Sequence, residues 1–297
     1  MPDSDRMDLL KERYSPEPDI AELLTSDARI DLHIHTCYSD GELTPQQVVD
    51  RWQDEGYKII AITDHDGMQG SVIGMDYSAD KDIRFISGIE FDSFDSYCRD
   101  IHMLGYGFDY NCPELREALL EIALKRARRN DQMREALGRM GYEITLDDIG
   151  AVNEGRHVGK PTFATILYRK GYLSDPQEAF RTVFRRPEIK SIVKETLDTG
   201  KVIELIHHAG GLAVLAHPME QRHLEESFDE FRPRLYNILD RIREYGVDGI
   251  ECCHPSADEE QQKLLADYAD HYGLIKTRGS DFHTDRHKRN FSRYHMP

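Results

Sequence analysis

The stretch Ile30-Asp31-Leu32-His33-Ile34-His35-Thr36 decides how this chain folds. Because successive side chains of a β-strand point to opposite faces, Asp31, His33 and His35 share one face, and the apolar residues between them share the other. Two imidazoles that lie two residues apart on one strand can bind the same metal ion. The stretch therefore predicts a strand with one face in the core and one face in a metal site.

Further apolar runs recur along the chain, with helical segments between most of them. The seven predicted strands are residues 30–34, 59–62, 84–89, 102–107, 212–216, 249–253 and 275–279. Runs such as IIAI and LAVLA are apolar on both faces, which is typical of parallel strands buried by helices. Alternating strands and helices predict an α/β fold with a parallel sheet. Closure of that sheet into a barrel would bring the first strand and the last together at one site.

Helix starts are marked by capping signals. Thr44 with Gln47 predicts one capping box, and Ser256 with Glu259 predicts a second, at the start of a helix that runs to about Gly273. Such signals between the apolar runs support the alternation of strands and helices.

Composition divides the chain into an extension, a barrel in two parts and an insertion. The predicted units are an acidic N-terminal extension at 1–28 with a short helix at 19–24, a metal-binding barrel at 29–108 and 201–297, and a helical insertion at 109–200. Helices are expected in the insertion at 113–141, 161–171 and 175–184, and no strand is expected there. The insertion is the most basic part of the chain, and we expect it above the mouth of the barrel as a lid or substrate domain.

Nine residues in short polar motifs can bind metal. They are His33, His35, Asp40, His65, Glu90, His102, His217, Asp281 and His283. Imidazoles with a few carboxylates suit Zn, Mn or Fe better than Mg or Ca. Three to five ligands for each ion would fill two or three sites. Clustered divalent ions that share a carboxylate are machinery for hydrolysing phosphate esters.

The order of these motifs resembles that of the PHP family (polymerase and histidinol phosphatase). The similar segments are DLHIHT at 31–36 followed by SDG and TP, ITDHD at 62–66, LAHP at 215–218 and GSDFH at 279–283. The resemblance implies a distorted (β/α)7 barrel with an inserted small helical domain, and a metal-dependent phosphoesterase activity. The most similar members act on nucleoside monophosphates and 3′,5′-bisphosphates or open cyclic phosphates.

The resemblance also implies how the nine residues share three ions. His33, His35, Glu90 and Asp281 would hold the first ion; Glu90 would bridge to a second, with His102 and His217; Asp40, His65 and His283 would hold the third. A hydroxide held between two ions would attack phosphorus in line. Asp64 and Asp66, which flank His65, are expected to support the ligands or cap strand ends.

Three residues outside the nine are further candidates. His254 follows the strand at 249–253 and could be a fourth ligand, a general acid for the leaving group, or a solvated residue; we favour the general acid. Lys160 lies where similar phosphatases often have Gly-Arg-Pro, and it is the predicted cation for substrate phosphate. Arg186 is a weaker second choice for that role.

Charge and cysteine content restrict partners and compartment. The 297 residues include 38 Lys and Arg against 55 Asp and Glu, giving a net charge of −17. Such a chain should repel long nucleic acids, whose binding needs basic surface. The odd number of five cysteines, with no signal peptide and no apolar run near 20 residues, predicts a cytoplasmic protein with reduced thiols and no membrane contact.

The predicted function is hydrolysis of a small phosphorylated metabolite or nucleotide, such as a nucleotide or sugar phosphate. The expected substrate is a phosphomonoester. The sequence does not decide whether the enzyme first opens a cyclic phosphate to produce it. The alternatives are a non-catalytic regulatory PHP domain stabilised by metal, an exonuclease, and a histidinol phosphatase. The complete ligand set argues against a non-catalytic domain. The negative net charge argues against an exonuclease that acts on long polymers.

Overall fold

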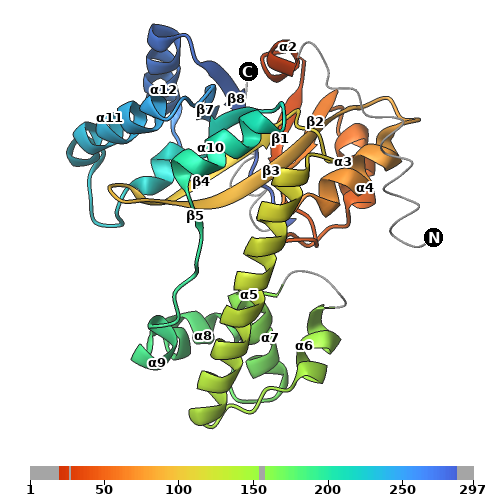
Figure 1. The fold of residues 1–297 in the computed structure, drawn as a ribbon, viewed down its shortest axis with the longest axis vertical. Coiled ribbons are helices and arrows are strands. Elements are labelled where there is room, and N and C mark those ends of the chain that lie inside the picture. Colours follow the sequence, from red (N-terminus) through yellow and green to blue (C-terminus); the bar gives the residue numbers. More distant parts are fainter. Residues whose placement is uncertain (1–19, 27, 154–157, 286–297) are drawn as a thin grey trace.

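The seven predicted strands form, and they curve into a nearly closed barrel (Figure 1). The structure, a computed structural model, describes residues 20–26, 28–153 and 158–285. The barrel strands, in spatial order, are β1 (Ile30–Ile34), β2 (Ile59–Ile62), β3 (Arg84–Asp95), β4 (Arg99–Tyr106), β6 (Leu212–Leu215), β7 (Gly249–Cys253) and β8 (Ile275–Arg278). Closure is made just past β8, where the His35 N–H donates to the Phe282 carbonyl at 2.9 Å and Ile34 bridges Phe282. The first and last histidine-containing motifs therefore meet at this seam.

One strand runs against the predicted direction. The expectation of a parallel sheet is wrong for β4, which is antiparallel to both β3 and β6. The reason is local: β3 and β4 are joined by a tight turn at residues 96–98, with no crossover helix between them. The start of β4 consequently lies at the same end of the barrel as the carboxyl ends of the parallel strands. This brings His102 to the site although it lies near the beginning of its strand.

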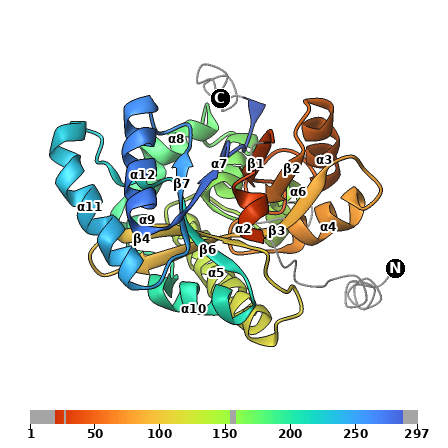
Figure 2. The same cartoon turned by 90° about the horizontal axis from the view of Figure 1, so that it is seen from above.

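Helices surround the barrel, with α3 and α4 on one flank and α11 and α12 on the other (Figure 2). The helices packed on the strands are α2 (Ile20–Leu24), α3 (Pro45–Asp54), α4 (Gln69–Ser78), α10 (Thr199–His208), α11 (Phe228–Glu244) and α12 (Glu259–Tyr272). The predicted capping box of Thr44 and Gln47 forms at the start of α3. The predicted box of Ser256 and Glu259 is wrong: Asp258 and Gln261 cap α12 instead.

The insertion is helical, with one short strand at its end. Its elements are α5 (Pro113–Arg139), α6 (Leu146–Asn153), α7 (Lys160–Arg169), α8 (Pro176–Arg181), η1 (Val183–Arg185), α9 (Pro187–Lys190) and β5 (Leu197–Asp198). Helix α6 was not expected, and the expectation of no strand is wrong because β5 pairs with β3. The predictions for residues 1–19, 27, 154–157 and 286–297 lie outside the described residues.

Helix α5 connects two separate cores. At 1.5 Å per residue its 27 residues span about 40 Å. Leu115 and Leu119 in its first half pack into the barrel core, whereas Met133 and Leu137 in its second half pack with α7 and α8 in a core of their own. The helix carries the rest of the insertion away from the barrel (Figure 1) and places its middle beside the barrel mouth. None of the helices in the described ranges combines the length and apolar character needed to cross a bilayer.

Candidate metal centre

The two histidines of β1 meet two carboxylates in the buried interior of the barrel mouth. His33 Nε2 and His35 Nε2 lie 3.1 Å apart. Asp281 Oδ1 lies 3.4 Å from the first of these nitrogens and 3.2 Å from the second. Glu90 Oε2 lies 3.4 Å and 3.2 Å from the same two atoms. The four residues predicted for one ion thus lie together, although they come from β1 and the residue after it, from β3 and from the segment that follows β8.

Glu90 reaches a second group of donors through its other oxygen. Its Oε1 lies 3.0 Å from His102 Nδ1 and 3.0 Å from His217 Nε2. Glu90 is at the middle of β3, and it is 1% exposed. One carboxylate therefore stands between both ligand groups, which is the arrangement that a bridging ligand requires.

A third group lies at the more open side of the mouth. Asp40 Oδ1 lies 3.2 Å from His283 Nε2, and Asp40 Oδ2 lies 3.9 Å from His65 Nε2. The ring of His35 stacks on that of His283 with centroids 4.1 Å apart. All nine predicted ligands therefore converge on one end of the barrel, in three adjoining groups.

The buried donors are incompletely satisfied by protein alone. Among the described residues, Glu90 Oε2, His217 Nδ1 and His254 Nε2 are buried without a hydrogen bond, and His65 Nδ1 has only carboxylates at ion-pair distance, Asp92 Oδ1 at 3.1 Å and Glu90 Oε2 at 3.2 Å. Buried polar atoms nearly always have a partner, and leaving one without costs about 1–3 kcal/mol. The Nε2 atoms of His33 and His35, which lie 3.1 Å apart, also need a partner that both can bind. Divalent cations fit the donor set because they satisfy several such atoms at once.

Electrostatics favour positive charge in this cluster. Burial would raise the pKa of Glu90, but the neighbouring His65, His33 and His102 outweigh it and hold the pKa well below its ordinary value. Burial likewise opposes ionisation of Asp281, and His33 is the main group that lowers its pKa well below normal. Both carboxylates are therefore ionised, as metal binding requires.

Two supporting carboxylates hold the ligands in place. Glu251 on β7 accepts a hydrogen bond from His33 Nδ1 at 3.0 Å and another from the His217 N–H at 2.9 Å. Asp64 accepts from the Thr36 N–H at 2.7 Å and from Ser39 Oγ at 2.6 Å, so it fixes the loop that follows β1. Asp64 was expected in such a role, whereas Glu251 was missed. Its signal was an acidic residue inside the buried strand GIECC.

The backbone is strained at three positions around the mouth. His217, Asp281 and Asp66 have φ angles of 25°, 50° and 48°, in the left-handed region that residues with a Cβ rarely adopt. Such strain of about 1–3 kcal/mol persists only where the surroundings enforce it, and it clusters at functional sites. Two of these three residues are predicted ligands.

His254 lies beside the first ligand group. Its ring is buried, and Nε2 lies 3.4 Å from Asp281 Oδ2. The Ser256 N–H donates to His254 Nδ1 at 3.0 Å, and Ser256 Oγ lies 2.7 Å from the same nitrogen. Ser256 is thus engaged with His254 and not with the start of α12. Because Nδ1 accepts a main-chain hydrogen bond, a neutral His254 carries its proton on Nε2, facing the site.

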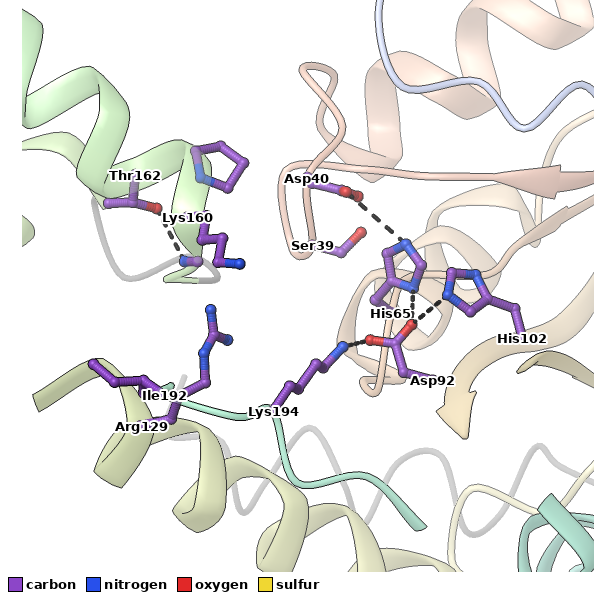
Figure 3. Close-up of a pocket in the computed structure, with 12 residues that line it drawn as sticks. Ser39, Asp40, His65, Asp92, His102, Arg129, Lys160, Thr162, Ile192 and Lys194 are labelled. Atoms are coloured by element: carbon purple, nitrogen blue, oxygen red, sulfur yellow. Dashed lines mark hydrogen bonds and ion pairs between the residues drawn. The ribbon is translucent and has the colours of Figure 1, made fainter. Parts of the chain in front are cut away.

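A pocket of about 400 Å³ opens between the barrel mouth and the insertion (Figure 3). Asp40, His65 and His102 line it on the barrel side, and Lys160 and Arg129 point into it from the insertion. No carboxylate in the described part of the chain forms an ion pair with either of these two cations.

The pKa values of the two cations are lowered, first by burial and then by neighbouring positive charge. Burial and the neighbouring Arg129 lower the pKa of Lys160, and burial and Arg126 lower that of Arg129. Arg186 is the exposed residue just before α9 and is not among the pocket-lining residues. Sequence reasoning missed Arg129, which was one of several basic residues on a long helix.

An α/β barrel with histidines and carboxylates gathered at one mouth defines the class of metallohydrolases. Within that class the chain belongs to the PHP domain family, whose model matches residues 31–294.

Three curated relatives are similar over most of their length. A 3′,5′-nucleoside bisphosphate phosphatase from Chromobacterium violaceum is 30% identical over 86% of this chain and 87% of its own. A phosphoribosyl 1,2-cyclic phosphate 1,2-diphosphodiesterase from Eggerthella lenta is 29% identical over 85% and 93%. A 5′-3′ exoribonuclease from Haemophilus influenzae is 28% identical over 86% and 90%.

A crystal structure from Bifidobacterium adolescentis, described as a metal-dependent phosphoesterase, matches with a TM-score of 0.73. It is 27% identical and covers 92% of this chain and 98% of that one. The protein is accordingly a metal-dependent phosphoesterase, a hydrolase of phosphoric esters, as the motifs predicted.

Proposed function

We propose that the protein hydrolyses a phosphate ester of a small molecule, a nucleotide or sugar phosphate, that carries a second anionic group. The observation that carries this proposal is the arrangement across one pocket: histidines and carboxylates on the barrel face two cations on the insertion, neither of which pairs with a carboxylate among the described residues. The scissile phosphate would lie at the barrel side, and the second anionic group would lie against Lys160 and Arg129. The insertion, residues 109–200, would then be the substrate domain.

The nine converging side chains would hold two or three transition-metal ions, with Mn, Zn or Fe suited to the mixture of imidazoles and carboxylates. The proposed groups are His33, His35, Glu90 and Asp281; Glu90, His102 and His217; and Asp40, His65 and His283. When bound, such ions supply an acidified water for attack and positive charge for the phosphate oxygens. Glu90 and Asp281 contribute the negative charge that makes cation binding favourable in this buried site.

His254 would donate the proton of Nε2 to the oxygen that leaves phosphorus. The Ser256 contacts fix the ring so that this nitrogen faces Asp281 and the site. We expect His254→Asn to lower kcat by roughly 10²–10⁴-fold for an alkyl phosphate, the usual scale of general acid catalysis. The loss should be much smaller for p-nitrophenyl phosphate, because its leaving group needs no proton.

Steady-state rates on both esters, with metal content measured in parallel, test this role. Equal losses on both esters together with a lower metal content would mean that His254 is a ligand. Unchanged rates on both would mean that it has no part in the reaction.

Lys160 and Arg129 should determine affinity for the second anionic group. We expect Lys160→Ala and Arg129→Ala each to raise KM roughly 10–100-fold for a 3′,5′-bisphosphate, since a hydrogen bond to a charged group contributes about 1.5–3 kcal/mol. kcat should change little, because these cations bind ground and transition states alike. KM for a substrate with a single phosphate should stay nearly constant.

Arg186→Ala is the matched control, because that side chain is exposed and lies outside the pocket. The panel should hold mononucleotides, 3′,5′-bisphosphates, cyclic phosphates, histidinol phosphate and a short 5′-phosphorylated RNA. A KM that is unaffected by both substitutions across this panel would remove the insertion from substrate binding. If the protein prefers the RNA, the proposed substrate class changes from a small molecule to a nucleic acid polymer.

A further inference from the structure

Two cations of the insertion reach two buried carboxylates at the rim of the barrel. Arg126 Nη2 on α5 donates to Asp66 Oδ2 at 2.8 Å. Lys194, on the segment between α9 and β5, contacts Asp92 Oδ2 and lies 3.7 Å from Asp66 Oδ2. The two carboxylates are themselves linked, because the Asp92 N–H donates to Asp66 Oδ1 at 3.1 Å. These four residues join both ends of the insertion to the strand ends that carry the metal-binding histidines.

The other oxygen of Asp92, Oδ1, faces His65 and His102. Asp92 Oδ1 lies 3.1 Å from His65 Nδ1 and 3.1 Å from His102 Nε2 (Figure 3). On His102 this is the nitrogen opposite to the one that lies 3.0 Å from Glu90. On His65 it is opposite to the nitrogen on the side of Asp40. Histidines that bind metal commonly donate their other N–H to a carboxylate, which fixes the ring and its tautomer.

Asp92 needs a cation to stay in this position. It lies on β3 two residues after Glu90, on the same face of the strand, and it is bonded to Asp66. Carboxylates that are close together in a buried site repel one another. Lys194 offsets the charge of Asp92 and occupies its Oδ2, which leaves Oδ1 directed at the imidazoles.

We propose that Lys194 and Asp92 act as a positioning pair: Lys194 holds Asp92, and Asp92 orients His65 and His102 for metal. Retention of ions at these two histidines thereby depends on docking of the insertion, so the substrate domain and the metal centre are coupled. Asp92 and Lys194 are positioning residues, and neither needs to touch the reacting atoms. The inference rests on the proposed function, since it takes His65 and His102 as ligands.

A double-mutant cycle measured by metal retention tests the pair without any assay of turnover. The manganese-loaded protein is titrated with a chelator, and ions left per chain are counted for wild type, Lys194→Met, Asp92→Asn and the double variant. We expect each single variant to weaken binding of at least one ion by roughly 10–100-fold, the usual effect of removing a supporting carboxylate. The double variant should be no weaker than Asp92→Asn alone, because Lys194 acts only through Asp92.

Lys194→Arg should restore most of the affinity, and Lys190→Met is the matched control, an exposed lysine in α9 outside the pocket. Thermal unfolding of each variant checks that it is folded, and Lys194→Gln repeats the test if the Met variant is not. Two results would overturn the proposal: independent, additive losses in the cycle, or normal metal retention in a folded Lys194→Met protein. A wild-type protein that binds no metal would instead remove the proposed function itself.

Discussion

Replacing Glu90 by Ala is expected to lower kcat for phosphate ester hydrolysis by roughly 10³-fold or more, since several kcal/mol of transition-state stabilisation would depend on the metal ions that we propose it holds. The two oxygens of Glu90 approach different ligand groups, at 3.0 Å from His102 and His217 and at 3.2 Å from His35. Its loss separates these groups. The fold should survive, because the apolar core is built from other side chains of the strands.

Phosphate release and circular dichroism on the same preparation measure both parts of this prediction. Glu117→Ala, an exposed glutamate on α5, is the control and should behave as wild type. A well-folded Glu90→Ala protein with near-normal turnover would contradict the role of Glu90 as a shared ligand.

Replacing Gly279 by Ala should damage stability and activity together. A Cβ at this position would lie 2.2 Å from the Cβ of His33 and 2.7 Å from Glu251 Oε1, so either the metal-binding strand or its supporting carboxylate must move. We expect the free energy of unfolding to fall by about 3 kcal/mol, at the upper end of the usual cost of overpacking. Turnover should fall as well, because His33 is displaced.

Gly138→Ala is a sharp control for that substitution. A Cβ at Gly138 meets no atom within 4 Å, and the residue lies inside helix α5. Alanine should stabilise the protein there by about 0.5–1 kcal/mol. Urea unfolding of both variants measures the contrast. Equal stability of the two would contradict the close packing of Gly279 against the site.

Local pattern was enough to predict where the strands lie and to single out the nine side chains that converge at the barrel mouth. Strands β1, β2 and β7 begin and end at the predicted residues, because runs such as IIAI are short, apolar and bounded by polar residues. The nine donors stood in short motifs, and each motif follows or lies within a strand. Closure of the barrel then brought them together, as the seam between His35 and Phe282 shows.

What could not be predicted depends on pairing between distant segments. The direction of β4 follows from the tight turn at residues 96–98, which has no strong sequence signal. Glu251 is 218 residues away from the histidine that it orients. Arg129 is one of several basic residues of α5, and which of them faces the pocket depends on how the insertion docks. The cap of α12 was misplaced because Ser256 binds the ring of His254 instead.

The central claim, that several metal ions held by these residues perform the hydrolysis, can be tested by one titration. Metal-free protein is titrated with Mn²⁺ while bound ions per chain and phosphate release from a 3′,5′-bisphosphate are followed together. We predict two or three ions per chain at saturation, as expected for clustered catalytic ions, and hydrolysis that appears only as ions beyond the first are bound. Binding of less than one ion per chain after reconstitution, or full hydrolysis by the metal-free protein, would contradict the account.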